Sequence, residues 1–368
     1  MWLNSIYPVP RPKPKSKRAG RVAARPVAGP VPRRAWAELD DEALLDVRLC
    51  DLKLSIAGTE LERRAERLNA ELAERGLTFR PHVWLSTEWF SPDGIPGFAI
   101  PFYLAHPRLM ELEQRQMHEV EGGTERSCLQ LMRHETAHAL DNAYQLHRRP
   151  DWREVFGHFD SAYDTHYHPK PYSKRFVRHL ELWYAQSHPA EDWAETFAVW
   201  LDPSSRWQKR YRGWAALEKL TYLDELMSAI GAEKPVKRGR DRIEALSELR
   251  LTLGDHYKAK RARYRLAQRR SYDRDLRRLF SEPTGAARER SAASFLRKIR
   301  PEIRKLVAHW TGEYQYAVDR VLSEIISRVE ELGLVVTSAA PHVKRDAMLL
   351  LAVQTLKYLN RGHHHFPR

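Results

Sequence analysis

Apolar and polar residues alternate in short stretches of the first half of the chain, and these stretches predict strands. The first stretch has apolar residues at every second position, the period of a half-buried strand: Cys50, Leu52, Leu54 and Ile56. Residues 79–85 and 97–104 read as two further strands, with a Ser-Pro-Asp-Gly turn at 91–94 between them. Pro101 suits an edge strand, because proline cannot donate a hydrogen bond to a second neighbouring strand.

Other stretches carry their apolar residues at helical spacing. A helix is predicted to begin after Thr59 and to end at Gly76, with one apolar face: Leu61, Ala65, Leu68 and Leu72. The break at 122–123, two glycines, precedes a second helix over 124–144. A third helix is predicted over 189–201, where proline at the first position is tolerated.

Beyond residue 235 the pattern is helical. A basic joint with proline and glycine, residues 234–242, precedes it. An amphipathic helix ends at Gly333, with the apolar positions Val318, Val321, Leu322, Ile325, Ile326 and Val329. Residues 348–359 predict one more apolar helix. We therefore expect an α+β domain with a small mixed sheet over residues 37–235 and an all-helical, basic module over 236–368.

Composition adds a predicted tail and a bias in charge. The chain is 42% hydrophobic and 10% aromatic, which is typical of a folded protein. Residues 8–34 hold seven prolines and nine Lys or Arg, and no acid precedes Glu38, so residues 1–36 are expected to form a disordered basic tail. The net charge of +14 favours acidic partners such as nucleic acid, although charge runs are also typical of solvated faces.

The cysteines and the apolar runs indicate in which cellular compartment the protein is expected. Cys50 and Cys128 lie far apart, which excludes a disulfide framework and a cysteine zinc site of the usual spacing. No apolar run approaches the length of a membrane span, and the first 16 residues lack an apolar signal core. These features together predict a cytoplasmic protein.

The candidate chemistry lies on the second predicted helix. His134-Glu135-Thr136-Ala137-His138 has the His-Glu-x-x-His pattern. Histidines four positions apart share one helix face, so both imidazoles can reach one Zn²⁺ ion, and Glu135 lies beside them to polarise a water molecule. Apolar neighbours on this helix indicate that it is buried, and its polar residues therefore need partners.

A catalytic zinc site of this kind requires a third ligand. Residue 144, ten positions after the first histidine, is a tyrosine, which cannot replace the third histidine of metzincins. The helix over 189–201 instead offers Glu191 and Glu195, one turn apart. One of them can bind the metal while the other accepts a hydrogen bond from a ligand imidazole, and the residue spacing permits either order. An acidic first turn is also favoured by the helix dipole alone.

Three segments resemble a bacterial family described as putative zinc-binding metallopeptidases: residues 88–94, 131–141 and 184–200. The Glu-x-x-Ala-Glu pattern is also similar to that of the anthrax lethal factor catalytic domain. The resemblance implies a zincin-like fold of the gluzincin type, with Glu191 as the third zinc ligand and Glu195 behind a ligand histidine. It also implies that Tyr184, seven residues before Glu191, faces the oxyanion. The resemblance covers roughly residues 80–225.

Several other residues have two interpretations. Asp141 either orients a ligand histidine or binds a cationic group of the substrate, or it forms a structural ion pair with an arginine. Tyr184 is either an oxyanion donor or a plain core tyrosine. Three histidines, His166, His168 and His188, could line the cleft, but isolated histidines are more often structural.

The sequence thus predicts a zinc-dependent metallopeptidase that binds one Zn²⁺ through His134, His138 and Glu191. In the predicted mechanism, zinc lowers the pKa of its water, Glu135 takes the proton, and Tyr184 helps to stabilise the oxyanion. The expected substrate is a peptide or protein. Two alternatives stay open: a non-catalytic zincin-fold protein that binds nucleic acid or an acidic partner, and a hydrolase of a non-protein amide.

Overall fold

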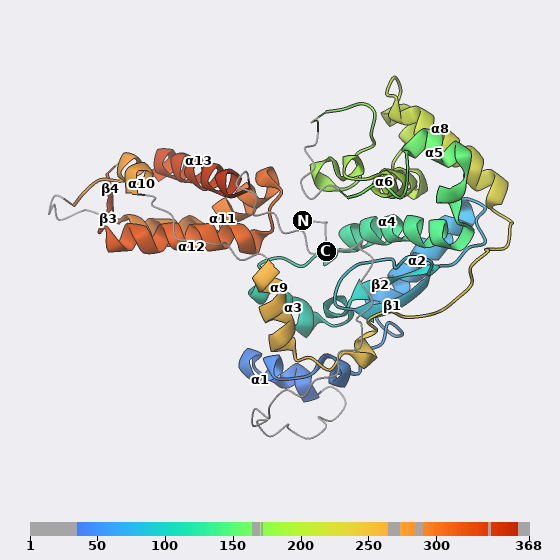
Figure 1. Ribbon diagram of the computed structural model, residues 1–368. Helices are drawn as coiled ribbons and strands as arrows, with labels where there is room; N and C mark the ends of the chain where they lie inside the picture. Colours follow the sequence, from blue (N-terminus) through green and yellow to red (C-terminus); the bar gives the residue numbers. More distant parts are fainter. Residues whose placement is uncertain are drawn as a thin grey trace, which may run out of the picture. The chain divides into compact units, whose positions relative to one another are not determined.

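The computed structural model describes residues 35–163, 170, 172–263, 273–283, 290–337 and 340–359 (Figure 1). These divide into two compact units. The larger holds the described residues up to Tyr257, apart from 115–119, and the smaller holds those five residues and the described residues from Lys258 on. The larger unit combines a small sheet with helices and the smaller is mainly helical, which confirms the predicted α+β class.

The last residue of the predicted tail is folded. Residues 1–34 of the predicted tail lie outside the described residues. Trp36, the last residue of that tail, is instead 1% exposed and donates from its indole nitrogen to the carbonyl of Leu52, 3.1 Å away. The predicted tail therefore extended too far, because its last residue has a buried hydrogen-bond partner.

Most of the larger unit is helical. Its α-helices are α1 (Asp41–Leu45), α2 (Glu60–Glu74), α3 (Pro107–Met117), α4 (Glu125–Tyr144), α5 (Pro150–Phe156), α6 (Pro189–Leu201), α7 (Trp207–Arg210), α8 (Ala216–Ile230) and α9 (Leu253–Arg263), of which α3 and α9 extend past the division. Short 3₁₀ turns lie at Ala35–Glu38, Leu49–Leu52, Phe102–Ala105, Leu146–Arg148, Glu181–Gln186 and Leu246–Glu248. The helices predicted over 59–76, 124–144 and 189–201 are confirmed as α2, α4 and α6.

The described sheet of this unit has two parallel strands, β1 (His82–Ser86) and β2 (Gly97–Pro101). Their register runs from His82 opposite Gly97 to Ser86 opposite Pro101. An isolated antiparallel bridge joins Phe90 to Ala99 of β2. The turn between the strands is held from α4, because Asn142 accepts from the amide of Gly94 at 2.8 Å and donates to the carbonyls of Pro92 and Ile95.

The strand predicted from Cys50 to Ile56 was wrong. Residues Leu49–Leu52 form a 3₁₀ turn, after which Lys53 has φ = 48°. Leu49 and Leu52 are both buried, three residues apart, so the apolar period is that of a turn. The amides of Leu49 and Cys50 donate to the carbonyls of Leu251 and Leu249, which fixes the turn against a distant segment.

That distant segment belongs to the larger unit, although the sequence placed residues 236–257 with the helical module. Trp84 donates from its indole to the carbonyl of Ile243 at 3.0 Å, and the hydroxyl of Ser86 donates to that of Glu244 at 2.7 Å. Ala245 packs in a small apolar cluster with Trp84 and Ala99. Isolated hydrogen bonds and contacts of this kind leave no periodic pattern of apolar residues, so the sequence did not predict them.

The smaller unit is a helical bundle closed by a minimal sheet. It contains α10 (Asp273–Leu279), β3 (Arg290–Ser291), α11 (Ala292–Thr311), α12 (Gln315–Glu331), β4 (Val335–Val336) and α13 (Ala340–Leu359). The antiparallel β3–β4 pair corrects the expectation of an all-helical module. The predicted amphipathic helix is confirmed as α12, which ends at Glu331, two residues before Gly333, and the helix predicted at 348–359 lies within α13. No helix within the described ranges is long and apolar enough to cross a membrane.

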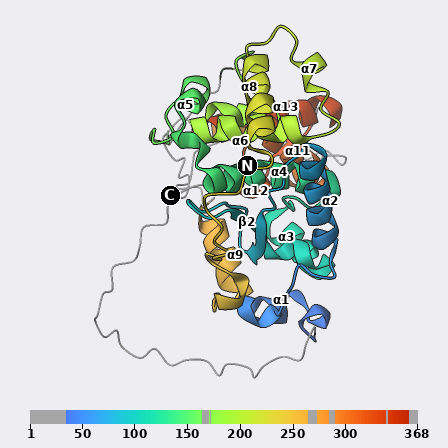
Figure 2. The ribbon, with the colours of Figure 1, turned by 90° about the vertical axis from the view of Figure 1, so that its right-hand side faces the viewer.

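Helix α4 is the central element of the larger unit, between α6 on one side and β2 on the other (Figures 1 and 2). It also contacts α2, through a buried ion pair. Arg133 donates from Nε and Nη2 to the two carboxylate oxygens of Glu71, each at 2.7 Å. Both side chains are buried, and this two-pronged pair fixes the rotation of α4 next to the predicted metal ligand at position 134.

Replacement of Glu71 is expected to destabilise the larger unit. Glu71→Ala leaves the buried guanidinium of Arg133 without its main partner, so the free energy of unfolding should fall by about 3–5 kcal/mol. Denaturant titration measures this change. Glu60→Ala is the control, because Glu60 pairs with Arg63 on the exposed face of the same helix; it should change stability by less than about 1 kcal/mol. Equal effects of the two substitutions would contradict this role of the Arg133 pair.

Candidate metal centre

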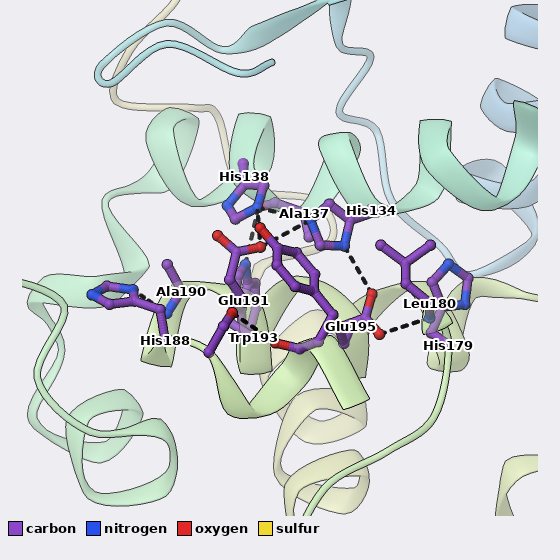
Figure 3. A network of polar contacts seen from close by, with 12 residues as sticks. His134, Ala137, His138, His179, Leu180, His188, Ala190, Glu191, Trp193 and Glu195 are labelled. Atoms are coloured by element: carbon purple, nitrogen blue, oxygen red, sulfur yellow. Dashed lines mark hydrogen bonds and ion pairs between the residues drawn. The ribbon is translucent and has the colours of Figure 1, made fainter. Parts of the chain in front are cut away.

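The two histidines are positioned by a well-formed buried helix. Thr124 caps α4 by accepting from the amide of Ser127, and the amide of Thr124 donates in return to the hydroxyl of Ser127. Residues 131–143 of α4 are then buried without interruption. His134 and His138 lie one turn apart and point toward α6, where Glu191 projects between them (Figure 3).

Three donor atoms from these side chains form a compact triangle. The Nε2 atom of His134 lies 3.1 Å from Oε2 of Glu191 and 3.2 Å from Nε2 of His138, and the remaining edge is 3.6 Å. Zinc bonds of roughly 2.0–2.2 Å in a tetrahedral site place donor atoms about 3.3 Å apart. The side chains are 3%, 6% and 0% exposed, so His134, His138 and Glu191 form a buried group that can hold a metal ion.

Glu195 lies on the far side of His134. Its Oε1 atom is 3.0 Å from Nδ1 of His134, and its Oε2 atom accepts from the amide of Leu180 at 2.8 Å. Since an ionised carboxylate only accepts, Nδ1 carries a proton, which leaves Nε2 as the atom through which His134 would bind a metal. This is the tautomer that a metal-binding imidazole needs.

The carboxylates also set the charge of His134. Burial lowers the pKa of His134, but the hydrogen bonds with Glu191 and Glu195 outweigh it and raise that pKa to about 10. The pKa of Glu191 is correspondingly depressed: burial opposes ionisation, and the two imidazoles outweigh it. Without a bound ion the imidazole of His134 is therefore protonated at neutral pH, so metal binding must release a proton.

Tyr184 is brought to this region, and Glu135 is the neighbour of His134 in the chain. Glu135 lies between the two histidines in sequence and is 1% exposed. Tyr184, from the 3₁₀ turn Glu181–Gln186, is 4% exposed, and its ring centroid lies 5.8 Å from that of His134 at an angle of 35°. The tyrosine that the resemblance selects is therefore adjacent to a candidate ligand.

Asp141 is not at the site, contrary to the role predicted for it behind a ligand histidine. Its two oxygens lie 2.7 Å from the amide nitrogen and from Nδ1 of His147. Seven residues return Asp141 to the same helix face as His134, but two turns further on, about 10.5 Å along the axis. Helical periodicity gives the direction of a side chain but not its position along the axis. The predicted alternative, an ion pair with arginine, is likewise replaced by the pair with His147.

Of the three isolated histidines that could line the cleft, the structure describes one. His188 precedes α6 and caps it, because its Nδ1 atom accepts from the amide of Ala190 at 3.1 Å. It thus has a structural role. His166 and His168 lie outside the described residues.

Sequence reasoning missed one residue that contacts the candidate ligands. The hydroxyl of Tyr163 donates to Oε1 of Glu191 at 3.0 Å. Tyr163 lies 28 positions before Glu191 in a segment between helices. No periodicity or motif marks such a contact, so nothing in the sequence alone could have found it.

The family comparison coincides with this geometry. Residues 105–212 match the family described as putative zinc-binding metallo-peptidase. The matched segment contains all three residues of the candidate metal centre and confirms the resemblance to this family of zinc-binding metallo-peptidases. No curated protein and no solved structure matched the chain.

The two glutamates of α6 should respond differently to truncation. Glu191→Ala removes a corner of the triangle and is expected to purify nearly free of metal. Glu195→Ala removes the partner of His134 Nδ1 and of the Leu180 amide but no corner of the triangle, so metal should still bind at saturation, with affinity about 10- to 100-fold lower. Metal analysis and zinc titration of both variants measure this. The reverse pattern, with Glu195→Ala empty and Glu191→Ala loaded, would show that the metal ligand is Glu195.

Proposed function

We propose that this chain is a zinc-dependent peptidase of the gluzincin type, with His134, His138 and Glu191 as zinc ligands. The observation that carries the proposal is the buried triangle of two imidazole nitrogens and one carboxylate oxygen, at spacings that suit tetrahedral zinc. The family match over the same segment supports it. Imidazole nitrogen with carboxylate oxygen is a donor set that suits zinc, and three protein ligands are typical of catalytic zinc sites.

Each side chain then has a defined part in amide hydrolysis. A zinc ion, when bound, supplies a Lewis acid and lowers the pKa of a water molecule in the open position. The carboxylate of Glu135 takes the proton of the attacking water and later gives it to the leaving amine. Glu195 holds the imidazole of His134 in its metal-binding tautomer. The hydroxyl of Tyr184 donates to the oxygen that becomes negative in the transition state.

The role of Glu135 is tested by Glu135→Gln, which keeps the size of the side chain and removes the base. Hydrolysis of a peptide library should be abolished, while zinc stays near one ion per chain, because this residue is assigned to water and not to metal. Retained cleavage would refute the mechanism. Parallel loss of zinc and activity would make Glu135 a structural residue.

Tyr184→Phe tests the oxyanion donor. Loss of a group that acts only in the transition state should lower kcat by roughly 10²-fold and leave KM nearly unchanged. Steady-state kinetics on one cleaved peptide give both constants. The ring and its contact with His134 are kept, so an unchanged kcat would identify Tyr184 as a packing residue.

A further inference from the structure

The second oxygen of the Glu191 carboxylate needs its own hydrogen-bond donor. Oε2 faces His134 and His138, and Oε1 points the other way in a side chain that is 0% exposed. A buried carboxylate oxygen without a donor carries a large desolvation penalty. The hydroxyl of Tyr163, 3.0 Å from Oε1, supplies the donor.

Tyr163 is fixed relative to Glu191 by the start of the same helix. Its ring is stacked on the imidazole of His188, with centroids 3.7 Å apart and planes at 11°. His188 is the capping residue of α6, three positions before Glu191 (Figure 3). Since its Nδ1 atom accepts from Ala190, its Nε2 atom carries the proton and donates to the carbonyl of Ser161 at 2.9 Å.

The beginning of this segment, residues 157–163, is anchored as well. Gly157 has φ = 104°, and a β-carbon added there would lie 3.3 Å from the ring of Pro189, so the chain passes close over the first turn of α6. Phe159 is stacked on His147, with centroids 4.3 Å apart. His147 is in turn held by the buried Asp141. The tyrosine therefore reaches Glu191 from a segment that is attached at several points.

We propose that Tyr163 is a positioning residue, whose hydroxyl holds the Glu191 carboxylate so that one oxygen alone faces the two histidines. The proposal rests on the assignment of Glu191 as a metal ligand. It has a chemical consequence, because a carboxylate that offered both oxygens would use the coordination position that a catalytic zinc site leaves to water. Tyr163 thus preserves the open position and orients the ligand.

Zinc affinity tests the proposal without any measurement of activity. Tyr163→Phe keeps the ring stacked on His188 and removes only the donor, so the Kd for zinc, measured by competition with a chelator, should rise about 10- to 100-fold. Tyr144→Phe is the matched control: it removes a tyrosine hydroxyl that donates to the carbonyl of Glu233 at 2.9 Å, from the same helix as the histidines. Its Kd for zinc should equal that of the wild type.

Cobalt(II) substitution adds a signature of coordination. The visible absorption of Tyr163→Phe should weaken relative to the wild type if Glu191 turns to bind through both oxygens and raises the coordination number. His188→Asn is the second variant; it keeps a capping acceptor, removes the stacked ring, and should also weaken zinc binding. The Tm of each metal-free variant shows whether the fold is intact.

The outcomes separate three situations. A Kd for zinc in Tyr163→Phe equal to that of the wild type overturns the proposal, including the case in which kcat falls, which would assign Tyr163 to the substrate. Equal loss of affinity in Tyr163→Phe and Tyr144→Phe overturns it too, as a general effect of lost stability. Failure of the wild-type protein to bind zinc would instead refute the proposed function, on which the inference rests.

Discussion

The contact between α4 and α6 buries two carboxylates against two imidazoles. Much of the surrounding structure provides the hydrogen bonds and ion pairs that offset the cost of burying these groups. Removal of charged groups from water is costly unless each one is paired and hydrogen-bonded. Glu191 and Glu195 are both 0% exposed, and each has partners on both oxygens. A metal ion in the triangle would add positive charge at the point where carboxylate and imidazoles converge.

Other buried charged side chains near this contact are also paired with an opposite charge. Arg133, next to His134, is paired with Glu71 of α2. Asp192, next to Glu191, is paired with Lys219 of α8. Burial raises the pKa of Asp192 to about 7, against the opposing effect of Lys219, which indicates how costly a buried charge is here. In the first turn of α6, Glu191 thus faces the candidate metal centre, whereas the following residue, Asp192, faces α8.

The candidate centre also depends on segments that carry no ligand. The amide of Leu180 fixes Glu195, and the hydroxyl of Tyr163 fixes Glu191. Both lie between α5 and α6 in the chain, and Tyr163 is attached to α6 through its ring stacked on that of His188. Ligands held to about half an ångström need such support, because helix geometry alone leaves side-chain rotation free.

The sequence by itself determined the features that depend on local spacing. The helices of His134 and Glu191 were predictable because apolar periodicity, capping residues and a proline at the first position act within a few residues. The His-Glu-x-x-His spacing and the two glutamates one turn apart identified the candidate chemistry for the same reason.

The tertiary structure decided which of these groups meet. His134 and Glu191 are separated by 57 positions and Tyr163 and Glu191 by 28, and contacts over such distances arise from packing that no local pattern encodes. Tertiary contacts also pair Asp141 with His147, away from the site, and hold the stretch at Cys50 in a 3₁₀ turn. Further contacts of this kind place residues 243–252 in the larger unit. Each of these depends on the three-dimensional position of a partner, whereas the sequence specifies only its identity and its order along the chain.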